Sequence, residues 1–161
     1  GPSTHDSKLT ADEQYTHITL WSILGSPLLI GCDMAELDDF TLNLLCNSEV
    51  IDVNQDELGW QASRIYGDDS YATYLKPLAD GTVAVAMFNL SSEPKKIGFI
   101  PRSLGVIGSQ VIRDLWRQKD ICTCGYHERW ETEVAPHGCV FVKLTPVQKN
   151  FVPEGFDKNI K

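Results

Sequence analysis

Apolar residues recur with a helical period in the first third of the chain and with a strand-like period afterwards. Four of them follow one another at spacings of three: Tyr15, Ile18, Trp21 and Leu24. This stripe predicts an amphipathic helix from Thr10 to Leu24. Thr10 and Glu13 have the spacing of a capping box, in which each side chain bonds the backbone of the other residue. Gly25, with the serine and proline that follow it, predicts the end of this helix.

A short apolar run and a second amphipathic stretch come next. Residues Leu28 to Cys32 form an uninterrupted apolar run, which is typical of a strand buried on both faces of a parallel sheet. A second helix is expected from about Asp38 to Leu45, and a short helical turn around Glu49 to Val53. The order helix, buried strand, helix indicates one piece of a parallel α/β architecture. Because the later strands look antiparallel, the parallel partners of this strand are expected upstream.

The remaining two thirds of the chain favour an antiparallel sandwich. Two strand-like runs, Ala72 to Lys76 and Thr82 to Phe88, flank Asp80-Gly81, and Asp-Gly between such runs predicts a hairpin. Further strands are expected at Lys96 to Ile100, Val111 to Leu115 and Cys139 to Leu144. Short strands separated by turn signals are typical of a sandwich. Residues 148–161 are polar and are expected to form a tail.

Composition narrows the class of protein. The chain has 161 residues, 42% of them apolar, which suits one folded domain or a small domain with part of another. Its formal net charge of -8 disfavours nucleic-acid binding, because an acidic surface repels phosphates. No apolar run is long enough to span a bilayer. The five cysteines are an odd number, which fits buried thiols better than a disulfide framework.

Several blocks of sequence carry a family signature. They are LTADEQYTHITLWSILGSPLLIGCDM (Leu9 to Met34), LLCNSEVIDVNQDELG (Leu44 to Gly59), VIRDLW (Val111 to Trp116) and APHGCVFVKLTP (Ala135 to Pro146). The first resembles family 27 of the glycoside hydrolases, the α-galactosidases and α-N-acetylgalactosaminidases. The second is similar to the passage from barrel to C-terminal domain in that family, and the last two look like markers of its β-domain. The blocks stand in the family's order and cover roughly residues 9–146.

The resemblance implies an α+β fragment: the last helix, strand and helix of a (β/α)8 barrel, followed by an antiparallel β-sandwich. Residues 1–58 would be the incomplete barrel end, 59–147 the sandwich and 148–161 the tail. The parent enzyme would hydrolyse terminal α-D-galactosides with retention, using two carboxylates about 5–5.5 Å apart. In the family both are aspartates on earlier strands, and their motifs are not in this sequence. We therefore expect no catalytic residue here, no cofactor, and an inactive isolated chain.

The partners follow from the same resemblance. They would be the upstream barrel portion and, through the parent enzyme, a galactoside; no nucleic acid and no membrane span are expected. An isolated chain would expose the apolar run from Leu28 to Ile30, so self-association is a further expectation. An extracytoplasmic location, periplasmic or secreted, is guessed from the substrate class. The alternative function is a non-catalytic β-sandwich for carbohydrate binding or structure, against which the helical residues 9–58 argue.

Asp33 is the candidate substrate-binding residue. It directly follows the buried strand, and the carboxyl ends of barrel strands form the active-site rim. The competing interpretation is a carboxylate that caps the next turn or pairs with a barrel arginine. Its neighbours Cys32 and Met34 are interpreted in the same way. Each is expected in the wall or core of the barrel, with a place at the active-site rim as the alternative.

Two larger sets have less specific patterns. Three cysteines and two histidines resemble a metal set, but Cys-x-Cys is not zinc-site spacing, and no metal is expected. They are Cys122, Cys124, His127, His137 and Cys139. Four aromatic residues could stack on a sugar, although aromatic residues in sandwiches are more often core. They are Tyr74, Trp116, Tyr126 and Trp130. Trp60 is expected to pack at the junction of barrel and sandwich.

Overall fold

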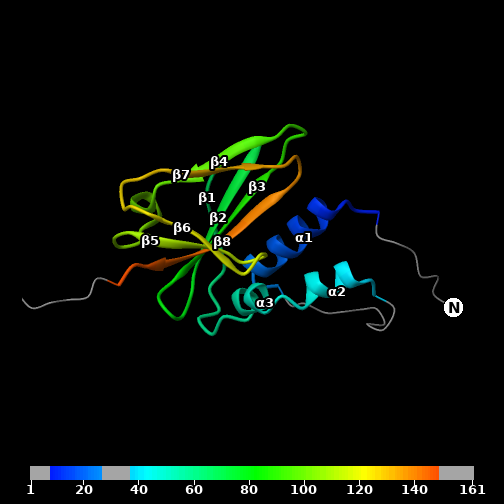
Figure 1. Ribbon diagram of the computed structural model, residues 1–161, viewed down its shortest axis with the longest axis horizontal. Coiled ribbons are helices and arrows are strands. Elements are labelled where there is room, and N and C mark those ends of the chain that lie inside the picture. The colour runs from blue at the N-terminus through cyan, green and yellow to red at the C-terminus, as the bar shows by residue number, and fades with distance from the viewer. Residues whose placement is uncertain (1–7, 27–36, 149–161) are drawn as a thin grey trace, which may run out of the picture.

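The computed structural model describes residues 8–26 and 37–148, and these form three layers. Figure 1 shows a two-stranded sheet on one side, a larger sheet in the middle, and helices on the other side. All strand pairs in the described residues are antiparallel. The described residues thus form an α+β fold with an antiparallel sandwich, as the sequence predicted; the packing of the helices on the large sheet was not predicted.

The larger sheet has six strands in the order β1-β2-β3-β8-β5-β6, and the smaller sheet pairs β4 with β7. The strands are β1 (Ser63–Gly67), β2 (Tyr71–Pro77), β3 (Val83–Asn89), β4 (Lys95–Phe99), β5 (Gln110–Asp114), β6 (Lys119–Cys124), β7 (Trp130–Val134) and β8 (Cys139–Pro146). The predicted hairpin joins β2 to β3, with Gly81 at φ +85°, a conformation that suits glycine. A short 3-10 helix, η2 (Pro101–Leu104), follows β4.

The central strand β3 is buried on both faces. Residues 84–88 of this strand are all nearly inaccessible to solvent. Val85 and Met87 face the small sheet, where they join Ile97, Phe99 and other apolar residues in the core between the sheets. Ala84 and Ala86 face the helices. A continuous apolar run is the expected sequence pattern for a strand covered on both sides.

Three short helices make up the third layer. They are α1 (Ala11–Ile23), α2 (Asp39–Leu45) and α3 (Ser48–Asn54). The capping box at α1 is present: the amide of Glu13 donates to the Thr10 hydroxyl, and the amide of Thr10 donates to the Glu13 carboxylate. The Asp38 carboxylate caps α2 by accepting a hydrogen bond from the amide of Thr41. Among the described residues, no helix is long and apolar enough to cross a membrane.

A second core lies between the helices and the large sheet. Figure 1 shows α1 beside β8 and β3, and α3 below it. Ile23 of α1 and Val50 and Val53 of α3 are buried against the sheet. Leu115 and Phe141 complete this core from the sheet side. Each fully buried side chain of this size contributes on the order of 2 kcal/mol of transfer free energy, so the helices are a packed layer of the sandwich.

The predicted apolar face of α1 is half confirmed: Tyr15 packs against Trp116 and Ile18 against the core under the helix, but the later part of the stripe is wrong. Trp21 and Leu24 are exposed, whereas Thr19, Ser22 and Ile23 are buried. A spacing of exactly three drifts around a helix with 3.6 residues per turn, so Trp21 and Leu24 leave the face that begins at Tyr15. Of this polar pair, Thr19 has a hydrogen-bond partner in the sheet layer, the Trp116 indole, whereas within the described residues the buried Ser22 hydroxyl has none.

Other differences concern strands and one aromatic residue. The sequence analysis did not predict β1, β6 or β7. Trp60 is 58% exposed in the described residues, and its packing at the junction of barrel and sandwich stays a prediction. The predicted strand from Leu28 to Cys32 and most of the predicted tail lie outside the described residues.

Candidate functional site

The candidate substrate residue Asp33 lies outside the described residues, as do Cys32 and Met34. The functional geometry that can be described is the contact between the helices and the sheet, and a groove beside it. Both involve the blocks that carry the family signature.

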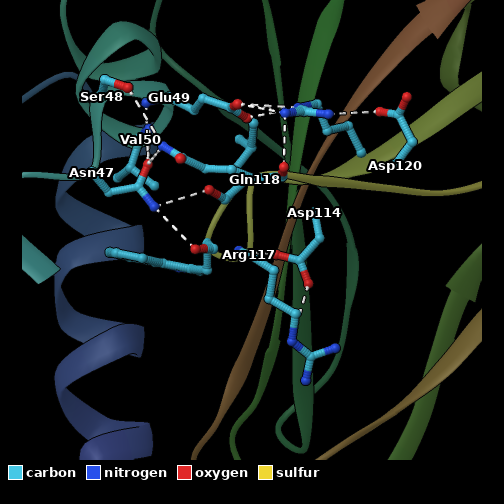
Figure 2. Close-up of polar contacts among 11 residues, drawn as sticks. Asn47, Ser48, Glu49, Val50, Asp114, Arg117, Gln118 and Asp120 are labelled. Atoms are coloured by element: carbon cyan, nitrogen blue, oxygen red, sulfur yellow. Dashed lines mark hydrogen bonds and ion pairs between the residues drawn. The ribbon is translucent and has the colours of Figure 1, made fainter. Parts of the chain in front are cut away.

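Asn47 stands at the centre of the contact (Figure 2). Its side-chain oxygen accepts hydrogen bonds from the amides of Glu49 and Val50, at 3.1 and 3.2 Å, and so caps α3. Its side-chain nitrogen donates to the carbonyls of Leu115 and Trp116, at 3.0 and 3.1 Å. A single asparagine therefore both starts a helix and fixes the end of β5 against it.

Arg113 makes the second part of the contact. Its Nε and Nη2 donate to the two carboxylate oxygens of Glu49 at 2.9 and 2.8 Å, a two-point ion pair. The same guanidinium donates to the Asp120 carboxylate and to the Gln118 carbonyl. These two carboxylates raise the pKa of Arg113 above its usual range. The Gln118 side chain closes the network by donating to Asn47.

Further hydrogen bonds join α1 and the end of α3 to the sheet layer. The indole nitrogen of Trp116 donates to the Thr19 hydroxyl at 2.7 Å. The Thr16 hydroxyl donates to the His137 carbonyl at 2.8 Å. The ammonium of Lys76, a residue only 1% exposed, donates to the Val53 carbonyl at 2.7 Å. Burial lowers the pKa of Lys76 from its ordinary value.

Sequence reasoning missed Asn47, Glu49 and Arg113 as a set. The signal was present, because the block Leu44 to Gly59 supplies the first two residues and VIRDLW supplies the third. The two blocks are thus two halves of one contact. The polar side-chain atoms of Asn47, Glu49 and Arg113 bond other groups of the protein. This contact is therefore suited to joining segments of the chain.

The cysteines and histidines do not converge. Within the part of the chain that the structure describes, no three His, Cys, Asp or Glu side chains come close enough to hold a metal ion. Cys124 is buried in the core between the sheets, but Cys122, two residues away, is exposed. Cys139 lies beside Thr19 under α1, and His137 is in a turn at φ +55°.

None of these thiols has the character of a nucleophile. Burial is the first cause that raises the pKa of Cys122 and of Cys124, and it raises the pKa of Cys139 to about 11. Because the thiolate is the reactive form, such thiols are nearly all protonated at neutral pH. Nucleophilic cysteine chemistry is therefore not supported at these three positions.

The four aromatic candidates separate into two groups. Tyr74 stacks edge-on against Phe88 under the helices, and Tyr126 contacts His127 in a loop. Trp116 and Trp130 both line one groove, with a volume of about 600 Å³. Each also packs against a core, Trp116 on the helix side and Trp130 between the sheets. The structure brings these two tryptophans to one site and leaves the other two candidates elsewhere.

Family comparisons match both parts of the chain. A model described as Alpha galactosidase A matches residues 4–56. A model described as the Alpha galactosidase C-terminal beta sandwich domain matches residues 68–144. The first match holds the three helices, and the second holds β2 to β7 and nearly all of β8.

Individual relatives agree with these matches. A probable alpha-galactosidase of Dictyostelium discoideum is 39% identical over 140 residues, covering 83% of this chain and 36% of that protein. The crystal structure of a GH27 β-L-arabinopyranosidase from Geobacillus stearothermophilus is similar, with a TM-score of 0.83, 32% identity, and coverage of 94% of this chain and 34% of that one. Alpha-galactosidase I from Mortierella vinacea gives a TM-score of 0.79 at 27% identity, covering 86% and 36%. The chain thus spans about a third of the length of the relatives it matches.

Proposed function

Because the chain belongs to glycoside hydrolase family 27, as a C-terminal part of an α-galactosidase-type enzyme, we propose that the whole protein hydrolyses terminal α-D-galactosides. The observation that carries this proposal is the identity of 39% with a probable alpha-galactosidase across 83% of the chain. The proposed reaction retains the anomeric configuration. It proceeds through two carboxylates, one as nucleophile and one as acid and base.

In this proposal the catalytic residues belong to the part of the barrel that is upstream of this chain. Residues 1–58 are the end of the catalytic barrel, 59–147 the sandwich and 148–161 a polar tail. The two catalytic aspartates belong to earlier barrel strands, and Asp33 is the proposed substrate contact from this chain. Support for Asp33 is its position after the apolar run Leu28 to Cys32, since barrel enzymes build their sites from the carboxyl ends of strands.

The upstream barrel is the proposed partner of α1. Leu20, Trp21 and Leu24 are all more than a third exposed, on the side of the helix turned away from the sheet. Apolar side chains gathered on one helix face favour burial against another layer. In the absence of the barrel, the same face supports self-association of the chain. The proposed location is extracytoplasmic, periplasmic or secreted, on the basis of the proposed class of substrate.

The test uses a longer protein that includes the complete barrel, with p-nitrophenyl α-D-galactopyranoside as substrate. Proton NMR during the first minutes identifies the anomer of galactose that is released first. Release of α-galactose first supports a retaining α-galactosidase. Release of β-galactose first would contradict the mechanism. Turnover of the N-acetylgalactosaminide or the β-L-arabinopyranoside in place of the galactoside would contradict the substrate.

A further inference from the structure

The groove that contains Trp116 and Trp130 is a separate feature from the helix–sheet contact. It lies where α1, the start of β8 and strand β7 come together, next to the turn after β5. Val140 and the exposed Ile121 add apolar surface to it. Its volume of about 600 Å³ is in the range of small-molecule sites.

Acidic residues outnumber basic ones along the groove. Four carboxylates line it, from Asp12, Asp114, Glu131 and Glu133, together with the guanidinium of Arg117. These acidic residues come from α1, from the end of β5 and from β7, so they are spread over several elements that line the groove. An acidic lining repels anionic ligands, and spread acceptors suit a ligand that carries many hydroxyl donors.

Several of these groups keep hydrogen-bonding capacity. Arg117 is 83% exposed, and its nearest acidic partner within the described residues, Asp114, is 3.9 Å from its Nε (Figure 2). In the same part of the structure, the carboxylates of Asp12 and Glu133 form no ion pair. A guanidinium and carboxylates can bond adjacent hydroxyls as donor and acceptor, while an indole ring packs against the apolar face of a sugar.

The groove is on a different side of α1 from the proposed barrel contact. Asp12 and Tyr15 line the groove from the first turns of α1, and Tyr15 packs edge-on against Trp116. The exposed apolar residues Leu20, Trp21 and Leu24 come from the later turns and face away from the sheet. The groove therefore uses the first turns of α1, and the proposed barrel contact uses the later ones.

We propose that this groove binds a neutral oligosaccharide, as a non-catalytic site on the sandwich. The site is independent of the proposed hydrolysis, because it uses none of the residues assigned to the barrel. A basic peptide is the other ligand that an acidic groove could attract, and its binding is the competing outcome of the test. The expected affinity is weak, on the order of a millimolar, since the groove is open and its ligand is well hydrated.

The experiment is an NMR titration of this chain with raffinose, following the indole N–H signals of the four tryptophans. The signals of Trp116 and Trp130 should shift in a saturable way, and that of the exposed Trp60 should not. Trp130→Phe assigns its signal. Sialyllactose and trilysine serve as the anionic and cationic comparison ligands, and both should leave the groove signals unchanged.

Variants locate the site. Arg117→Ala and Glu133→Gln should each weaken raffinose binding by about tenfold, the loss expected for a charged hydrogen bond. Matched changes at exposed residues outside the groove, Arg102→Ala and Glu57→Gln, should leave binding as in the wild type. The proposal is overturned if raffinose causes no saturable shift, if it binds equally well to all four variants, or if trilysine or sialyllactose binds in its place.

Discussion

The two faces of the large sheet are covered in different ways. Toward β4 and β7, the covering core is made mainly of apolar side chains such as Phe99, Met87 and Val142, beside a buried hydrogen bond from Asn89 to the Val134 carbonyl of β7. Toward the helices, a core of similar kind is crossed by directed polar contacts. These contacts run from Asn47, Arg113, Lys76 and Trp116.

This difference indicates which interactions position the small sheet and which position the helices. Apolar packing is non-directional, and it tolerates changes that keep volume and pattern. Hydrogen bonds to carbonyls fix distance and direction, so they set the position of a short helix that packing alone would hold loosely. The helices, which the family resemblance assigns to the barrel end, are therefore held in register with the sandwich.

The largest expected effect is the loss of unfolding free energy when a phenylalanine is removed from either core. Phe141→Ala on the helix side and Phe99→Ala between the sheets should each lower the free energy of unfolding by about 3–5 kcal/mol, because each leaves a cavity at a residue that is 1% exposed. Urea unfolding followed by circular dichroism gives both values. If Phe141→Ala costs less than about 1 kcal/mol, the helices are a loose attachment and the comparison fails.

The next effect isolates the polar contact. Asn47→Ala removes the cap of α3 and both bonds to the carbonyls after β5, and should cost about 2 kcal/mol of unfolding free energy. Asn43→Ala is the matched control, because Asn43 is exposed within α2. Thermal melts of the two variants measure the difference. Equal stability of both variants would show that Asn47 contributes no more than a surface residue.

A smaller effect concerns pH. Burial lowers the pKa of Lys76, so the unfolded chain binds this proton more tightly than the folded chain. Lysine 76 should therefore make the folded state more stable as pH rises from the lowered pKa toward the ordinary value of about 10.4. Lys76→Met removes this contribution. Urea midpoints of wild type minus variant should increase over that range, and a constant difference would contradict the assigned pKa shift.

The sequence predicted the local signals well and the long-range ones poorly. Thr10 with Glu13 began a helix as expected, since both members of a capping box are close in sequence. Strand β7 was missed although Trp130, Thr132 and Val134 alternate with two glutamates, a period that marks a half-buried strand. Strand β6 gave less signal, because nearly all of it is exposed at the sheet edge.

The helix–sheet contact was beyond sequence reasoning for a different reason. Asn47 and Leu115 are 68 positions apart, and nothing in a single sequence fixes which residues meet over that separation. The same holds for the groove, where α1 meets β7 and β8. The resemblance supplied the blocks, and the fold showed which blocks contact each other.

The most direct test of the account compares hydrolysis of p-nitrophenyl α-D-galactopyranoside by two proteins. One is this 161-residue chain at high concentration, and the other is a longer protein with the complete barrel. The account predicts that only the longer protein releases nitrophenol, because it assigns the catalytic carboxylates to the upstream barrel. Release of nitrophenol by the 161-residue chain itself would contradict the account and would place catalytic groups within this sequence.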